Sequence, residues 1–346
     1  MLLDHVSFYI NSLWLSFDKF DPLFPDLAQF WLRYSSEPVA PGFLLVNGVM
    51  VWYLYQRRLA QGDSPSMVRR YLIERGLFLV LIQLIWVNSA WSGFRELNID
   101  HFGIIGCIGV SMCLLALVMG QNWMVRLLIA ALIAASYPAL SHIKYDITEP
   151  AQVWIVETFI TAGKLNSYPV IPWFAVALLG TVIAPMWIQK WTDARSRLTG
   201  TLILGCAAMG LALLIRSIEI YGSEFSYSSL MHPSFIHDLK YPPTLFFSIW
   251  FFALNMFCVC LLLILGSTLP WVLKPLRIVG QVPLFFYLLH IPILAVITRR
   301  LDFYYRQGDV PEVLFAAALL FSVMVPLSFW FARLKASSNN KLIRMM

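Results

Sequence analysis

Charged side chains are scarce in this chain. They make up 13% of its 346 residues, whereas a soluble domain carries about 25%. Hydrophobic residues make up 59% of the chain, and the mean hydropathy is +0.71. This balance excludes an ordinary soluble domain. It predicts an all-α, polytopic integral membrane protein, because a backbone in lipid must satisfy its own hydrogen bonds.

Several other features are missing. The five cysteines all fall in apolar stretches, so we expect neither a disulfide framework nor a metal site. No Gly/Ser-rich linker interrupts the chain, which predicts one membrane domain over residues 1–346. We also find no phosphate-cradling glycine loop, no cleavable signal peptide and no internal repeat of the kind found in inverted-repeat transporters. The net charge of +6 is spread over short loops, which does not suggest a nucleic-acid partner.

Apolar windows of about 17–25 residues predict the membrane spans. The first is the weakest because it contains Asp4, His5 and Asn11. We expect about ten transmembrane helices, with eleven as the alternative in the family fold discussed below. The expected spans are 2–17, 38–56, 71–92, 101–119, 122–140, 168–189, 198–217, 241–267, 279–298 and 311–333.

Lys and Arg residues are more frequent in one set of loops than in the opposite set. By the positive-inside rule this predicts that both chain ends are cytoplasmic. The pair Arg299-Arg300 is discordant, because it falls on the outer side; snorkelling from the helix end is one explanation. The longer loops 18–37, 141–167 and 218–240 then face outwards, where a bulky substrate would arrive.

Three segments stand out at the ends of the expected spans: YPVIPWFAVALLG at 168–180, KYPPTLFF at 240–247 and GQVPLFFYLLHIPI at 280–293. Together with DHVSFYI at 4–10, PVAPGFLLVNG at 38–48 and RRYLIERGLFLV at 69–80, the chain resembles bacterial relatives of the heparan-α-glucosaminide N-acetyltransferase catalytic domain. Many relatives have a histidine where Glu37 stands, and they begin further upstream of Asp4.

This resemblance implies a membrane-embedded acyltransferase of the cell (inner) membrane. It would take an acyl group, usually acetyl, from cytoplasmic acetyl-CoA and pass it to an extracytoplasmic acceptor. The acceptor would be an envelope glycan, an amino sugar, or a small amine or hydroxyl compound. Membrane lipids and a second copy of the chain are further expected partners.

Acyl transfer from a thioester needs a base near the attacking group. His290 lies inside a long apolar run, and His5 lies in the first expected span beside Asp4. Ionisable residues at membrane depth usually mark a functional path, so we take His290, His5 and Asp4 as candidate catalytic residues. Adjacent residues on a helix point about 100° apart, which makes Asp4 a poor direct orienter of His5. Each histidine could instead be a structural polar residue.

Arg69, Arg70 and Arg75 are candidate donor-binding residues, because guanidinium groups pair well with phosphates. Lys240, Tyr241, Tyr168 and Trp173 are candidate acceptor-binding residues at outer helix ends. The simpler reading for all seven is interfacial anchoring. His232, His237 and Asp238 admit a metal site by spacing, but we expect them to be solvated loop residues.

A carrier or exporter of a small anionic or lipid-linked solute is the alternative function. It would use the same buried polar residues without making or breaking bonds. The two functions predict different effects of CoA on stability. Binding of its CoA donor should stabilise a transferase, whereas a carrier should not respond to CoA.

Overall fold

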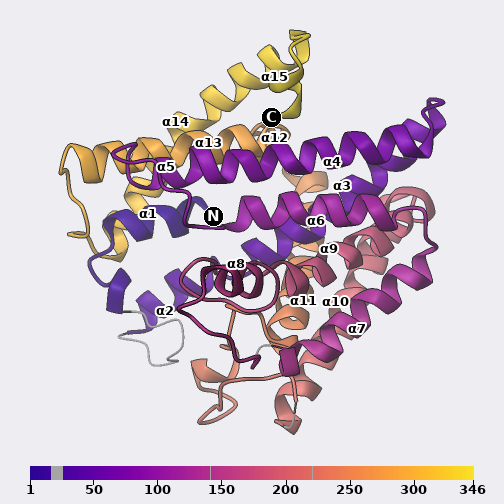
Figure 1. Ribbon diagram of the computed structural model, residues 1–346, viewed down its shortest axis with the longest axis horizontal. Coiled ribbons are helices and arrows are strands. Elements are labelled where there is room, and N and C mark those ends of the chain that lie inside the picture. Colours follow the sequence, from indigo (N-terminus) through magenta and orange to yellow (C-terminus); the bar gives the residue numbers. More distant parts are fainter. Residues whose placement is uncertain (17–25, 141, 220) are drawn as a thin grey trace.

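The computed structural model describes residues 1–16, 26–140, 142–219 and 221–346. Over these residues the regular structure is helical, and no strand is formed apart from two isolated bridges. The helices pack in a bundle in which α4 (Pro65–Ile82) and α6 (Ile104–Val118) run side by side (Figure 1), and α3 (Val39–Ala60) packs against both. Of the expected outer loop 18–37, residues 18–25 lie outside the described residues. The predicted all-α polytopic class is confirmed.

Seven helical segments are long and apolar enough to cross a membrane. They are Leu27–Ala60, Pro65–Trp91, Val170–Lys190, Ala194–Ile218, Leu245–Thr268, Pro283–Arg300 and Val310–Ser337. Two shorter apolar helices, α6 (Ile104–Val118) and α7 (Trp123–Leu140), lie where two further spans were expected. The first expected span is different, because α1 covers only Leu2–Ile10.

The helix α1 has nine residues and so is about 14 Å long, roughly half of what the hydrocarbon core requires. The backbone leaves the helix at Asn11, whose side chain donates to Ser7 Oγ and to Gln29 Oε1. Beyond this point the backbone N–H of Ser12 donates to the Gly308 carbonyl and that of Leu13 donates to Asn11 Oδ1. These bonds replace the backbone bonds that a longer helix would have made. The prediction of a span over 2–17 was therefore wrong.

Proline and capping residues set the starts of the later helices. Ser64 accepts a hydrogen bond from the backbone N–H of Met67 and begins α4 (Pro65–Ile82), which continues through a π-helical turn (Gln83–Val87) into α5 (Asn88–Trp91). Thr244 caps α11 (Leu245–Thr268) in the same way. Pro283 begins α13 (Pro283–Ala295), directly after α12 (Lys274–Gln281). Proline in the first turn leaves no N–H unpaired, which is its usual role there.

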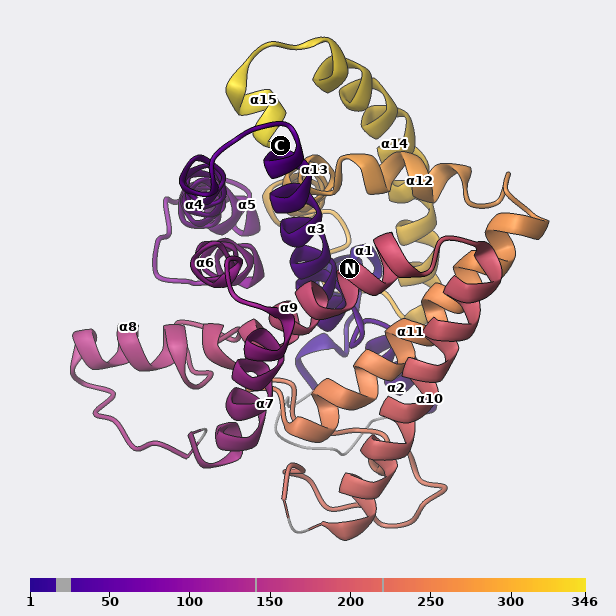
Figure 2. The same ribbon diagram turned by 90° about the vertical axis from the view of Figure 1, so that its right-hand side faces the viewer.

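The helix α3 (Val39–Ala60) is central. It packs against α4, α6, α9 (Val170–Pro185) and α11 (Figure 2). Contact with α9 is very close: a Cβ added at Gly48 would lie 1.9 Å from the Ala177 carbonyl oxygen, and one at Gly180 would lie 2.1 Å from that of Leu45. The pair α4 and α6 meets similarly at Gly76 and Gly109. Small residues at these crossings let helix backbones approach, as expected in membranes.

The segment after α13 holds α1 in place. The backbone N–H groups of Arg306 and Gly308 donate to the carbonyls of Tyr9 and Ile10, each at 2.9 Å. Arg299 donates from Nη1 to the Trp91 carbonyl at the end of α5, at 2.8 Å. This bond explains the discordant arginine better than snorkelling does, because Arg299 is tied to a helix end inside the protein.

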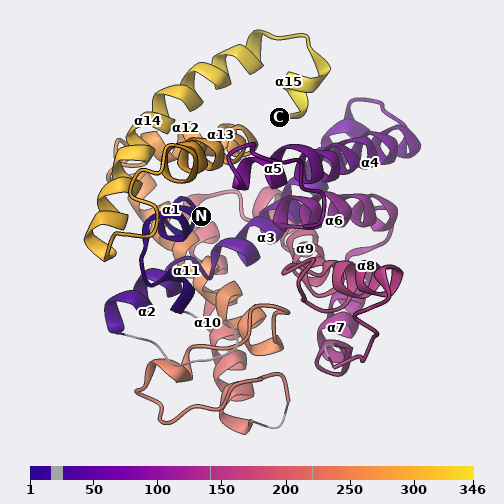
Figure 3. The same ribbon diagram turned by 60° about the vertical axis from the view of Figure 1, so that its left-hand side comes forward.

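The last long helix, α14 (Val310–Ser337), packs against α1, α12 and α13. The chain then turns back, so that α15 (Lys341–Met345) lies over the ends of α3 and α4 (Figures 2 and 3). Lys341 Nζ lies 2.9 Å from Glu74 Oε2 and fixes this turn to α4. The remaining α-helices are α2 (Leu27–Tyr34), α8 (Pro150–Phe159), which contacts α9, and α10 (Ala194–Ile218), which pairs with α11.

The close crossing of α3 and α9 yields a first prediction. Gly48→Ala should lower the thermal unfolding temperature of the detergent-purified protein, because the new methyl group overlaps the Ala177 carbonyl. Overpacking of this kind costs roughly 1–3 kcal/mol. Gly210→Ala is the control, because a Cβ at Gly210 meets nothing within 4 Å. Equal unfolding temperatures for the two variants would contradict the packing described here.

Candidate functional site

Two histidines from opposite ends of the chain meet in the interior. His5 of α1 and His290 of α13 are joined by a hydrogen bond of 2.7 Å between His5 Nδ1 and His290 Nε2. Their rings are parallel, with centroids 4.9 Å apart. His290 Nδ1 lies 2.7 Å from the Phe286 carbonyl oxygen. The two residues that the sequence suggested as alternative bases are thus parts of one unit.

The Phe286 carbonyl determines where the protons lie. A carbonyl oxygen can only accept, so His290 Nδ1 carries a proton and donates it. In the neutral pair, His290 Nε2 is then an acceptor, and His5 Nδ1 must be the donor. This leaves His5 Nε2 with a free lone pair. His5 is therefore the member of the pair that can act as a base. Its hydrogen bond to His290 keeps His5 in the tautomer that is protonated at Nδ1.

The two histidines differ in their access to the cavities described here. His5 lines a small cavity of about 30 Å³, together with Asp4, Ser36, Tyr168, Lys240 and Tyr287 among others. His290 is fully buried and is not part of that lining. A volume of this size holds one water or one small chemical group. His290 therefore cannot touch a ligand in this cavity without a rearrangement.

Asp4 does not contact the imidazole of His5. Its carboxylate accepts a hydrogen bond from Ser36 Oγ at 2.9 Å and lies 3.5 Å from Arg33 Nη1. This agrees with the expectation that Asp4 is a poor orienter of its neighbour. Asp4 instead forms the first member of a buried ionic cluster beside the small cavity.

The same cluster contains Glu37 and Lys240. Lys240 Nζ lies 3.0 Å from Glu37 Oε2, and Arg33 Nε lies 3.8 Å from Glu37 Oε1. Burial lowers the pKa of Lys240, but the Glu37 carboxylate, followed by Tyr168 and Asp4, outweighs this effect and raises the pKa above its usual value. Two carboxylates thus face two cations, so the cluster is balanced, as buried charges must be.

The aromatic acceptor-binding candidates are only partly brought together. The hydroxyls of Tyr168 and Tyr241 lie 3.0 Å apart, and the rings meet edge to face. Tyr168 lines the small cavity next to Lys240. Trp173 is fully buried in the core and lines neither of the two cavities described here. Its ring lies against that of Tyr168, with centroids 5.8 Å apart, and its buried Nε1 has no hydrogen-bond partner among the described residues.

Arg216, at the end of α10, organises the outer segment that carries Lys240. It is fully buried and donates to the carbonyls of Phe225, Ser234, Phe235 and His237 and to Ser223 Oγ, at 2.6–3.2 Å. It does not pair with Glu219 or reach the outer surface. Residues 223–237 are therefore folded around one guanidinium group.

Asp238 completes this arrangement. Its carboxylate accepts backbone bonds from Glu224, Phe225 and Leu239, and a bond from the Thr244 hydroxyl at 2.9 Å. Burial raises the pKa of Asp238 despite these bonds. The prediction that Asp238 is a solvated loop residue was wrong, because its carboxylate replaces backbone acceptors inside the folded segment. Within the described part of the chain, no three His, Cys, Asp or Glu side chains are grouped as metal ligands.

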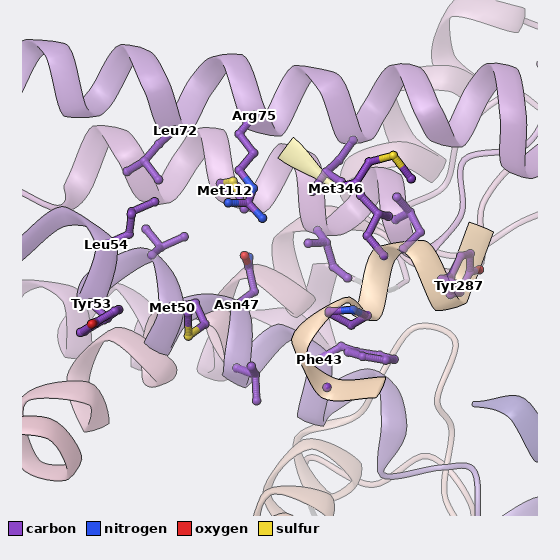
Figure 4. Close-up of a pocket in the computed structure, with 18 of the residues that line it drawn as sticks. Phe43, Asn47, Met50, Tyr53, Leu54, Leu72, Arg75, Met112, Tyr287 and Met346 are labelled. Atoms are coloured by element: carbon purple, nitrogen blue, oxygen red, sulfur yellow. The ribbon is translucent and has the colours of Figure 1, made fainter. Parts of the chain in front are cut away.

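A much larger cavity, of about 500 Å³, lies on the other side of Tyr287 (Figure 4). Its walls come mainly from α3, α4, α6 and α13, and most of the lining is apolar. Arg57, Arg75 and Lys335 supply positive charge to it. Phe43, Ile104 and Tyr287 line both this cavity and the small one. The two cavities therefore meet at a shared wall next to His5.

The three predicted donor-binding arginines separate. Arg75 lines the large cavity, and its buried Nε has no hydrogen-bond partner among the described residues. Arg70 is exposed and pairs with Glu74 at 3.0 Å, and neither Arg69 nor Arg70 belongs to the lining. Arg57 and Lys335 were not predicted as donor-binding residues, because basic residues at helix ends resemble topology signals.

A comparison with known protein families gives one match. The model of the family described as heparan-alpha-glucosaminide N-acetyltransferase, catalytic, matches residues 9–221 of the chain. No curated protein matches the chain. The matched segment contains α3, α4 and α6, which form most of the large cavity, and it ends within the loop that follows α10.

The role of Arg216 yields a second prediction. Arg216 Nη1 lies 3.9 Å from Asp238 Oδ2. Arg216→Gln should unfold residues 221–241 locally, because it leaves Asp238 as a buried charge and removes several donors at once. Breaking one partner of a buried charged pair costs roughly 3–5 kcal/mol. Limited proteolysis should then cut this segment, and the unfolding temperature should fall. Arg195→Gln, at an exposed position of the same helix, should change neither result.

Proposed function

The chain belongs to the heparan-α-glucosaminide N-acetyltransferase catalytic family, and on this premise we propose that it transfers an acetyl group from acetyl-CoA to an acceptor on the far side of the membrane. The chain is a multi-pass membrane protein of an acyltransferase family. The observation that carries the proposal is the meeting of the two cavities at Tyr287, beside His5, whose Nδ1 is bonded to His290.

The large cavity has the chemistry that a CoA donor requires. Arg75, Lys335 and Arg57 bring three cations to its wall. None of them forms an ion pair with a carboxylate of the described residues. Guanidinium and ammonium groups without a partner favour phosphate. The long apolar lining suits the extended arm that carries the thioester.

The small cavity suits the acceptor. It has room for one small group between His5, Lys240 and Tyr168. In the proposed reaction, His5 Nε2 removes a proton from the acceptor hydroxyl or amine as its oxygen or nitrogen attacks the thioester carbon. The C–S bond then breaks, and His5 returns the proton to the leaving CoA thiolate. An acceptor O–acyl or N–acyl bond replaces the thioester bond.

His290 is a positioning residue in this scheme. Its fixed protonation at Nδ1 keeps His5 as the tautomer whose lone pair faces the cavity. An amino sugar or a glycan hydroxyl on the extracytoplasmic side is the acceptor that the family relationship favours. We propose the cell membrane as the location, with the basic end of the large cavity on the cytoplasmic side.

The base assignment yields a third prediction. His5→Ala should lower the transfer rate by roughly 100- to 10,000-fold, because general-base catalysis contributes about that factor. His290→Ala should also lower the rate, by roughly tenfold or more, through loss of the tautomer of His5. The measurement is incorporation of radiolabelled acetyl into amino-sugar and glycan acceptors. Stabilisation by acetyl-CoA should remain in both variants, and a fully active His5→Ala protein would remove His5 from the mechanism.

The donor site yields a fourth prediction. Acetyl-CoA should raise the unfolding temperature of the wild-type protein, because it binds the folded state. Arg75→Gln and Lys335→Gln should each weaken acetyl-CoA binding by roughly tenfold or more, since hydrogen bonds to charged groups are the strong ones. Arg70→Gln is the matched control and should bind normally. Absence of any stabilisation by saturating acetyl-CoA would favour a carrier over a transferase.

A further inference from the structure

Asn47 is a polar side chain in the middle of an apolar wall. It lies on α3 and lines the large cavity. Its exposed fraction is 9%, and its buried Nδ2 has no hydrogen-bond partner among the described residues. Most buried amide groups in proteins are paired, so each exception needs an explanation. The Nδ2 group of Asn47 therefore contributes no hydrogen bond that would stabilise α3 in the protein without a ligand.

The surroundings of Asn47 restrict what could pair with it. Figure 4 shows Asn47 and Arg75 reaching into the cavity from opposite walls, α3 and α4. The neighbouring wall is formed by apolar side chains such as Met50, Leu72 and Met112. A plain hydrocarbon chain would fill this space but would leave the Asn47 amide unsatisfied. A ligand that fits here is mainly apolar and carries a hydrogen-bond acceptor.

The position of Asn47 also matters. Arg75, on the facing wall, offers an unpaired Nε to the same cavity, and Tyr287 belongs to the end that meets His5. A donor bound with its phosphates at the arginine and its thioester at Tyr287 would cross the wall that contains Asn47. In a CoA thioester, the segment between phosphates and sulfur is the pantetheine arm, which contains two amides.

We propose that Asn47 donates a hydrogen bond from Nδ2 to an amide carbonyl of the pantetheine arm. This inference rests on the proposed function, because it takes acetyl-CoA as the donor. Asn47 is then a positioning residue. It recognises the donor by its amide and sets how far the thioester reaches towards His5. A fatty chain or a simple alkyl thioester of equal length would lack this bond.

The test compares two ligands in detergent-purified, full-length protein. One is radiolabelled acetyl-CoA, and the other is S-acetyl-pantetheine, which keeps the amides but lacks the nucleotide, used as a competitor. Asn47→Leu should weaken both by a similar factor, roughly five- to tenfold. Arg75→Gln should weaken acetyl-CoA much more than S-acetyl-pantetheine. Met50→Leu lines the same cavity without a polar group and is the matched control.

The outcomes separate the two proposals. If wild-type protein fails to bind acetyl-CoA, the proposed function falls before any variant is compared. If wild-type protein binds and Asn47→Leu binds both ligands within twofold of it, the role of Asn47 is overturned while the function stands. Loss of acetyl-CoA binding with normal S-acetyl-pantetheine binding overturns it too. Asn47→Ser, which shortens the side chain, gives the same comparison should the leucine variant not fold.

Discussion

The hydrogen bond between His5 and His290 is the constraint on which the rest of the site depends. It joins α1 to α13 at 2.7 Å and is anchored by the Phe286 carbonyl behind it. Because α1 is too short to be fixed by crossing the membrane alone, other contacts must hold it. The bonds from Arg306 and Gly308 to its last carbonyls do so, as does the bond from the Tyr9 hydroxyl to the Trp91 carbonyl at 3.1 Å.

Charge balance is the second requirement at this depth. Asp4, Arg33, Glu37 and Lys240 bring two negative and two positive charges together beside the small cavity. Buried ion pairs are weak sources of stability, since desolvation offsets much of the attraction. Their presence next to the proposed base therefore argues for a functional role. The cluster provides polar groups beside His5. Its four charges sum to zero, so the cluster as a whole does not oppose protonation of His5.

The sequence predicted the class of fold and the residue types of the site, but not how those residues pair. A shortage of charged residues and the presence of long apolar runs were sufficient to predict the helical membrane fold. Both features reflect the free energy of transferring side chains from water into the bilayer. The half-length α1 was not predictable, since it depends on the Asn11 side chain meeting Gln29. His5 and His290 were visible as polar residues in apolar runs. Their pairing joins positions 285 residues apart, and a sequence pattern does not show such a contact.

The donor site shows the same limit. Arg69, Arg70 and Arg75 look alike in sequence, yet they point to different sides of α4, and only Arg75 reaches the cavity. Lys335 resembles a topology signal until α14 brings it to the same wall. Asn47 is a single amide in an apolar run, and its meaning appears only when the cavity beside it is known.

The two cavities, one large and mainly apolar and one small and polar, explain how a reaction can cross a membrane with little movement of its reactants. They share Phe43, Ile104 and Tyr287 as a wall. If a donor fills the large cavity and an acceptor approaches the small one, only the acyl group has to pass that wall. The barrier to crossing is then lowered, because neither the phosphates of the donor nor the polar acceptor enters the apolar interior. In the proposed reaction, the partition of the interior at Tyr287 therefore keeps donor and acceptor on separate sides of one wall, with His5 on the acceptor side.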